Sequence, residues 1–339
     1  MTRAGRGRCT LEDVAARAGV SRATVSRVVN GSPQVSADVR RVVEAAIDDM
    51  GYAPNRAARS LAGRRSETIA LVVSESSVRL FADPFFAGTT LGITAALAET
   101  PYQLVLLMTQ TDADRDRAVR HLVRGGTDGA LVLSARAEDP LAGRLAEAGV
   151  PSVVAGRPPS GVAVGWVDAD NEGGAHGAVA HLLARGRRCI GTVAGPADMV
   201  PGADRRTGWA RGLAEAGIDP VPGLVADGDF TRAGGEAAAR ALLARRPDID
   251  GLFVASDLMA LGALDALRAT GRTVPDDVAV VGFDDTELAR SADPPLTTVR
   301  QPIELLGTAM ARLLVEQIEQ DAKPSGVVLQ TELVVRASG

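Results

Sequence analysis

Two arginines near the start of the chain have the chemistry and spacing of a recognition surface. Arg22 opens a predicted helix over residues 22–30, and Arg27 follows a little more than one turn later. A guanidinium group can donate two hydrogen bonds to O6 and N7 of a guanine, and the methyl group of Ala23 could contact a thymine. The alternative is that both arginines are ordinary solvated residues. The elements around them favour the first interpretation.

Three predicted helices position these arginines. Thr10 can cap the first helix, and Gly19 ends it. Ser21 can cap the second helix after a short turn, and the third helix runs over residues 36–50. Val25 and its helical neighbours face inward, which leaves the arginines facing outward. Two short helices about a glycine turn, braced by a third, form a helix-turn-helix module, whose second helix enters the major groove of DNA.

The charge of the chain is unevenly distributed. Residues 1–65 carry 12 arginines and six acidic residues, a net of +6, whereas the rest carries −11 within a total of −5. This asymmetry indicates an appended module that binds a polyanion. No apolar run reaches the ~18 residues of a membrane span, and no signal-peptide core follows the basic N-terminus. Because Cys9 and Cys189 are distant in sequence, we expect no disulfide and a cytoplasmic, nucleoid-associated protein.

Two other classes of protein are disfavoured. The three histidines, His121, His176 and His181, lie apart from any cysteine or carboxylate at metal-ligand spacing. The chain also has no glycine-rich nucleotide motif and no GxSxG nucleophile motif, so we expect no enzyme, metal or cofactor. A solute-binding transport protein would carry an export signal and no DNA module, which is the reverse of this chain.

Two segments, LEDVAARAGVSRATVSRVVNG and VSADVRRVVEAAIDDMGYAPNRAARSLAG, closely resemble the headpiece of the lac/gal repressor family. The resemblance implies a basic arm over residues 1–9, a headpiece over residues 10–53, and a hinge helix with linker over residues 54–65. The hinge helix is too short to be stable alone, so it should fold when paired with its dimer mate on DNA. The resemblance assigns Leu61 to a wedge in the minor groove, which kinks the duplex. The alternative for Leu61 is an apolar contact to the rest of the chain.

The resemblance and the helix pattern together assign twelve residues to DNA contacts. These are Ser21, Arg22, Ala23, Thr24, Ser26, Arg27, Asn30, Tyr52, Asn55, Arg56, Arg59 and Leu61.

The remainder of the chain alternates short apolar runs with amphipathic stretches of helical length. This alternation predicts parallel sheets with helices on both faces. Roughly 270 residues are too many for one such sheet, and the pattern restarts near Asp170, so we expect two similar lobes like those of periplasmic binding proteins. We place the first lobe at about 66–168 plus 297–323, and the second at about 169–296 plus 324–339.

Polar residues follow several of the predicted strands. Ser74, Ser256 and Asp284 each come directly after an apolar run or one residue later. Because open α/β sheets bind ligands beyond the carboxyl ends of their strands, two facing lobes would form a cleft there, and a ligand would close it.

The family resemblance implies an effector site in this cleft. Arg205 matches a ligand-clamping arginine, and Asp284 matches an acid that contacts ligand hydroxyls. Two departures leave the ligand class open: Gly156-Arg157 stands where members often have Asp-Arg, and an insertion, SSVRLFAD, precedes Phe85. The residues assigned to the effector are Ser74, Phe85, Arg205, Phe230, Ser256, Asp284 and Gln301.

These expectations define a dimeric transcriptional repressor. It would bind a palindromic operator and be released by a small sugar-like effector, and it would control carbohydrate-utilisation genes. The chain lacks the leucine heptads of a tetramer, so a homodimer is favoured. The alternative is an activator or a corepressor-type regulator that responds to a metabolite other than a sugar.

Overall fold

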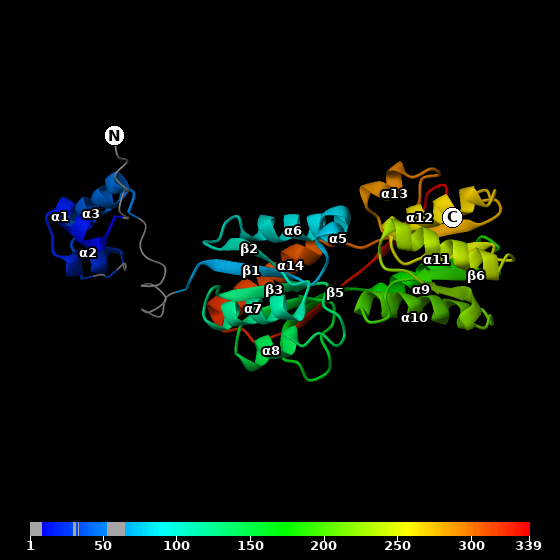
Figure 1. The fold of residues 1–339 in the computed structure, drawn as a ribbon, viewed down its shortest axis with the longest axis horizontal. Coiled ribbons are helices and arrows are strands. Elements are labelled where there is room, and N and C mark those ends of the chain that lie inside the picture. The colour runs from blue at the N-terminus through cyan, green and yellow to red at the C-terminus, as the bar shows by residue number, and fades with distance from the viewer. Residues whose placement is uncertain (1–8, 30–31, 33, 53–64) are drawn as a thin grey trace. The chain divides into compact units, whose positions relative to one another are not determined.

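The computed structural model describes residues 9–29, 32, 34–52 and 65–339 (Figure 1). The chain forms two compact units, residues 1–66 and residues 67–339. Part of what the sequence predicts lies outside the described residues. This part comprises the hinge helix and the DNA contacts Asn30, Asn55, Arg56, Arg59 and Leu61.

The first unit contains the three predicted helices. They are α1 (Leu11–Ala18), α2 (Arg22–Val29) and α3 (Ala37–Met50). Thr10 caps α1 through a reciprocal pair of hydrogen bonds, because its hydroxyl accepts from the amide of Asp13 at 3.3 Å and its amide donates to the Asp13 carboxylate at 2.8 Å. Gly19 ends α1 with φ at 67°, a left-handed conformation that glycine adopts without strain. Val14, Val25 and other small apolar side chains fill the core of the unit. The predicted helix-turn-helix module is confirmed.

The second unit contains two six-stranded sheets, one in each lobe. The first sheet is parallel throughout and has the order β11-β5-β4-β3-β1-β2. Its strands are β1 (Thr68–Val73), β2 (Gln103–Met108), β3 (Gly129–Leu133), β4 (Ser152–Ala155), β5 (Gly165–Ala169) and β11 (Gly326–Leu329). The second sheet has the order β12-β10-β9-β8-β6-β7, and only β12 runs antiparallel to its neighbour. Its strands are β6 (Ile190–Ala194), β7 (Val225–Asp227), β8 (Gly251–Val254), β9 (Ala279–Asp284), β10 (Thr297–Arg300) and β12 (Glu332–Val334).

Helices cover both faces of the first sheet (Figure 1). They are α5 (Ser77–Ala82), α6 (Pro84–Leu97), α7 (Asp112–Val123), α8 (Leu141–Glu147) and α14 (Ile303–Gln320). Ile69 and Leu71 of β1 join the apolar cluster that contains residues of α6 and α14. Ala70 and Val72 join the cluster that contains residues of α7 and α8. The strand is therefore apolar on both faces because successive side chains point to opposite helix layers.

Two glycines allow α6 and α14 to approach closely. A Cβ atom on Gly92 would lie 1.9 Å from the carbonyl oxygen of Glu304, and one on Gly307 would lie 2.1 Å from that of Thr89. No larger residue fits at either position without moving a helix. Thr308 also donates a hydrogen bond of 3.1 Å to the carbonyl oxygen of Gly92. The helix that returns from the C-terminal part of the chain is thus integral to the first lobe.

Helices also flank the second sheet, with α9 and α10 on one side and α11 and α12 on the other (Figure 1). The helices of this lobe are α9 (Asn171–Ala184), α10 (Val200–Glu215), α11 (Arg232–Arg245), α12 (Asp257–Ala269) and α13 (Glu287–Ser291), with a short 3-10 turn, η1 (Pro222–Leu224). Trp209 of α10 is 1% exposed, and its indole donates a hydrogen bond of 3.2 Å to the carbonyl oxygen of Ile190. None of the helices that the structure describes is long and apolar enough to cross a membrane.

The strand pairing differs from the predicted lobe boundaries at two places. β10 was expected in the first lobe, but it pairs with β9 in the second sheet. β11 was expected in the second lobe, but it pairs with β5 in the first sheet. The chain therefore passes between the lobes three times, after β5, after β10 and after β11. The residues of β10 and β11 carry no local sign of the sheet that each strand joins, so their pairing could not be assigned from the sequence.

Candidate functional site

Helix α2 presents most of the described side chains that were predicted to contact DNA. The exposed ones are Ser21, Arg22, Ala23 and Arg27. Thr24 and Ser26 are half-buried, and Val25 and Val28 are buried in the core of the unit. The amide of Thr24 donates a hydrogen bond of 3.1 Å to Ser21 Oγ, which therefore caps the helix. The opposition of an apolar and a polar face leaves both arginines available to a base edge.

Arg22 and Tyr52, two further predicted DNA contacts, also have partners within the first unit. Arg22 Nε lies 2.8 Å from Glu12 Oε1, and their side chains are 70% and 61% exposed. So exposed an ion pair contributes little stability. Tyr52 is buried within the apolar core of this unit, so its ring contributes to the packing that supports α2.

A cavity of about 410 Å³ lies in the second unit, lined by residues of both lobes. Its volume is within the range of small-molecule sites. Six of the seven predicted effector residues line it: Phe85, Arg205, Phe230, Ser256, Asp284 and Gln301. Ser74 is not among the described residues that line the cavity; its hydroxyl lies 3.0 Å from Thr109 Oγ1 and 3.4 Å from Asp139 Oδ2.

Arg205, on α10, is the centre of a buried polar cluster. Its Nε donates a hydrogen bond of 2.8 Å to Asn171 Oδ1, and its Nη1 lies 3.4 Å from Asp284 Oδ1. The guanidinium stacks on the ring of Phe283 at 3.7 Å from the ring centre. Burial lowers the pKa of Arg205, and the carboxylates around it, led by Asp284, oppose that shift. A guanidinium held in this way has a fixed orientation toward the cavity.

Asp284 ends β9 in an unusual backbone conformation. Its φ is 121°, which non-glycine residues rarely adopt, and such strain is concentrated at functional sites. The side-chain amide of Gln301 donates a hydrogen bond of 2.6 Å to Asp284 Oδ1. Burial raises the pKa of Asp284 well above its ordinary value, and Arg205 opposes that shift. Arginine, carboxylate and amide together can bind the neighbouring hydroxyl groups of one ligand.

The three remaining predicted effector residues, Ser256, Phe230 and Phe85, also make contacts within the protein. Ser256 is buried and caps α12, because its hydroxyl accepts a hydrogen bond of 3.2 Å from the amide of Met259. Phe230 is only 4% exposed and packs in the core of the second lobe at the edge of the cavity. Phe85 is half-buried, and its ring meets that of Phe86 edge to face at 5.5 Å.

Arg157, which follows the glycine that departs from the family pattern, connects the lobes. Its Nη1 donates a hydrogen bond of 2.9 Å to Asp168 of the first lobe, and its Nη2 pairs with Asp204 of the second. All three residues line the cavity. Burial raises the pKa of Asp168 to about 6, although Arg157 lowers it. Asp168 therefore supplies an acid in the cleft despite the altered Gly-Arg sequence.

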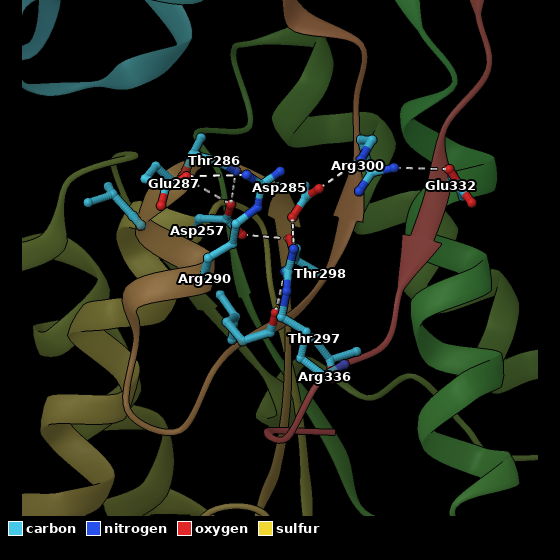
Figure 2. A network of polar contacts seen from close by, with 12 residues as sticks. Asp257, Asp285, Thr286, Glu287, Arg290, Thr297, Thr298, Arg300, Glu332 and Arg336 are labelled. Atoms are coloured by element: carbon cyan, nitrogen blue, oxygen red, sulfur yellow. Dashed lines mark hydrogen bonds and ion pairs between the residues drawn. The ribbon is translucent and has the colours of Figure 1, made fainter.

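A second polar network supports the site from behind (Figure 2). Asp257 is completely buried and accepts hydrogen bonds of 2.6 Å from Thr298 Oγ1 and 2.8 Å from the amide of Thr286. Burial raises the pKa of Asp257 to about 7. The neighbouring Asp285 is held by Arg300 and Arg336. Because Asp257 follows Ser256 and Asp285 follows Asp284, this network fixes the two loops that carry the predicted effector residues.

The sequence analysis did not assign several residues that line the cavity. These are Arg79, Asp83, Arg157, Asp168, Asn171 and Asp204. Asp168 is the penultimate residue of β5 and Asn171 lies two residues beyond its end, so both could have been found by the strand-end rule that identified Asp284. No local signal in the sequence indicates Arg79, because the extra helix α5 brings it to the cleft. Among the described residues, no group of histidine, cysteine and acidic side chains could hold a metal ion.

The first unit and the cleft together define a class of protein: a transcriptional regulator with a helix-turn-helix reader and a two-lobed effector core. The model "Bacterial regulatory proteins, lacI family" matches residues 10–55, and the model "Periplasmic binding protein-like domain" matches residues 179–339. The HTH-type transcriptional regulator CelR of Thermobifida fusca is 52% identical over 338 residues, which cover 98% of this chain and 99% of that protein. The chain belongs to the lacI family of bacterial DNA-binding transcriptional regulators.

Solved structures agree with this assignment. A transcriptional regulator CelR–cellobiose complex is 50% identical, with a TM-score of 0.78, and the match covers 98% of this chain and 100% of that one. The Lac repressor dimer bound to operator and the anti-inducer ONPF is 30% identical, with a TM-score of 0.84 and coverages of 98% and 99%. The predicted fold, a helical headpiece and a two-lobed core with parallel sheets, is therefore confirmed.

Proposed function

We propose that this protein is a cytoplasmic repressor of carbohydrate-utilisation genes that leaves its operator when a sugar closes the cleft. The observation that carries the proposal is the buried cluster of Arg205, Asp284 and Gln301 in a cavity lined by both lobes. Charge-assisted hydrogen bonds from such groups suit vicinal hydroxyls, and the aromatic rings of Phe85 and Phe230 suit the apolar face of a sugar ring.

The proposed effector is a short oligosaccharide of the cellobiose type. A relative with half of its residues identical has been solved with cellobiose, and the cavity has a volume of about 410 Å³. The groups around Arg205 and those around Arg157 form one continuous network, because Asn171 accepts a hydrogen bond from Arg205 and donates one to Asp168, the partner of Arg157. A network of this extent offers donors and acceptors to more than one sugar ring.

We also propose that the protein acts as a homodimer on a palindromic operator. Among the described residues of 67–339, the large exposed apolar side chains lie in the first lobe with the single exception of Val335. They include Leu106 on the edge strand β2 and Leu91 on α6. Exposed apolar side chains on an edge strand are typical of a protein interface, and two joined headpieces match a palindrome.

Selection of bound duplexes from a random DNA pool, repeated with a panel of sugars, tests the function. The expected result is an enriched palindrome whose binding cellobiose abolishes. A palindrome that is bound only when a ligand is present would show a corepressor-type regulator. A palindrome indifferent to every sugar would refute the sugar response, and the absence of any palindrome would refute the operator.

Two pairs of variants sharpen this test. Arg205→Ala should abolish the cellobiose response, whereas Arg206→Ala, on the same helix and outside the cavity lining, should preserve it. Leu106→Glu should weaken the dimer in size-exclusion chromatography with light scattering and lower operator affinity with it. Val335→Glu, at 58% exposure in the other lobe, is the matched control for the dimer.

A further inference from the structure

The insertion before Phe85 forms an additional helix at the cleft. This helix, α5, is capped by Ser76, whose hydroxyl accepts a hydrogen bond of 3.2 Å from the amide of Arg79. It lies between β1 and α6, at the end of the first lobe that faces the second (Figure 1). One consequence is that Arg79 lines the cavity, although neither the strand ends nor the family pattern places an arginine there.

Arg79 contacts residues of both lobes. In the first lobe it pairs with Glu75, and its Nε lies 3.9 Å from Asp83 Oδ2. Its guanidinium carbon lies 5.7 Å from the centre of the Phe86 ring. In the second lobe the same carbon lies 5.0 Å from the centre of the Phe230 ring. Arg79 therefore closes one part of the cleft between aromatic rings of the two lobes.

The guanidinium of Arg79 retains an unused hydrogen-bond donor. Its side chain is only 12% exposed, its Nη1 pairs with Glu75, and its Nε is buried without an acceptor. None of the described residues accepts a hydrogen bond from Nη2, so this nitrogen can donate to a ligand oxygen in the cavity. An acceptor is also close by, because Asp83, whose Oδ2 lies 3.9 Å from Arg79 Nε, lines the same cavity.

This group of residues repeats the chemistry of the Arg205 cluster at a second place in the same cavity. Each combines a guanidinium that stacks on a phenylalanine ring with a carboxylate at its side. We propose that Arg79 is a specificity-determining residue of a second sugar subsite, where it hydrogen-bonds the outer ring of a disaccharide effector. The proposal rests on the sugar response proposed above. It means that the inserted helix determines which sugar is accepted as the second ring of the effector.

Calorimetric titration of the full chain with cellobiose, maltose and glucose tests this role. In Arg79→Ala the affinity for cellobiose should fall ~10- to 100-fold, the loss of one charged hydrogen bond. The affinity for glucose should change by less than about 3-fold, because the Arg205 cluster remains. The ratio of the cellobiose affinity to the glucose affinity should therefore fall ~10-fold or more. The difference between the affinities for cellobiose and for maltose should also become smaller.

Two further variants separate recognition from structure. Arg79→Lys keeps the positive charge beside Glu75 but lacks the planar set of donors, so its ratio of cellobiose affinity to glucose affinity should fall less than that of Arg79→Ala. This variant also keeps the test valid if Arg79→Ala does not fold. Arg144→Ala removes another arginine of the first lobe, which pairs with Asp116 and does not line the cavity, and should leave the ratio of the cellobiose affinity to the glucose affinity unchanged. Thermal unfolding without ligand checks that each variant is folded.

Distinct outcomes overturn the two proposals. If the wild-type protein binds none of the three sugars, the sugar response fails and the subsite fails with it. If the wild type binds cellobiose and the Arg79 variants have the same ratio of cellobiose affinity to glucose affinity, only the proposed subsite is refuted. Tighter cellobiose binding in Arg79→Ala would show that Arg79 obstructs the ligand, and an equal change of the affinity ratio in Arg144→Ala would show that the loss of any arginine in the first lobe is responsible. Either result would overturn the subsite.

Discussion

Asp257→Asn is expected to remove a pH dependence of stability from the second lobe. Burial raises the pKa of Asp257 from an ordinary 3.8 to about 7. The folded protein thus retains a proton that the unfolded chain has released over this interval. A raised pKa of this kind contributes stability that is fully present below about pH 4 and is lost as the pH rises to about 7.

The magnitude follows from the size of the shift. One proton held by the folded state alone changes the free energy of unfolding by about 1.4 kcal/mol per pH unit. Between pH 5 and pH 7 the wild type should therefore lose about 2 to 3 kcal/mol through Asp257. Its complete burial means that solvent screening does not reduce this figure much. In the Asn variant the amide oxygen can accept from Thr286 and the amide group can donate to Thr298, so the substitution itself should cost about 1 kcal/mol.

Urea unfolding followed by tryptophan fluorescence, with Trp166→Phe in both proteins so that Trp209 of the same lobe is the reporter, measures the effect. The difference in stability between wild type and variant should change across pH 5–7 and become constant above it. Asp168, whose pKa is raised to about 6, contributes equally to both proteins and cancels. Asp277→Asn is the control, because hydrogen bonds from Thr273 lower the pKa of that exposed carboxyl, so its contribution belongs to a more acidic range. If the difference in the free energy of unfolding between wild type and Asp257→Asn did not change with pH, the reasoning would be refuted.

Three further predictions concern the packing of α6 against α14, the cap of α1 and the DNA contact of α2. Gly307→Ala should destabilise the core by about 1 to 3 kcal/mol, because its Cβ would collide with the carbonyl oxygen of Thr89. Gly177→Ala, with open space around its Cβ, should be neutral or slightly stabilising in the same thermal melt. Thr10→Ala removes both hydrogen bonds of the α1 cap and should lower the stability of the headpiece by about 1 kcal/mol, measured by circular dichroism. Arg22→Ala should relax base preference at one operator position, at a cost of about 1 to 3 kcal/mol, and repeated duplex selection would show a uniform loss if this assignment were wrong.

The sequence by itself determined the headpiece and the character of the core. The caps and apolar spacing of α1, α2 and α3 involve residues only a few positions apart, so Thr10, Gly19 and Ser21 could be assigned from the chain. Continuous apolar runs identified the buried strands, since parallel sheets covered on both faces need such runs. The rule of strand ends led to Asp284, and the family resemblance led to Arg205.

Only the tertiary structure decided which distant segments meet. The Arg205 cluster joins the starts of α9 and α10 with the ends of β9 and β10, and no local pattern reports such distances. The same is true of β10 and β11, whose composition fits either sheet, and of Arg79, which meets Phe230 only because the lobes face each other. Local propensities act within a few residues, whereas the cleft depends on how two packed lobes align side chains more than a hundred residues apart.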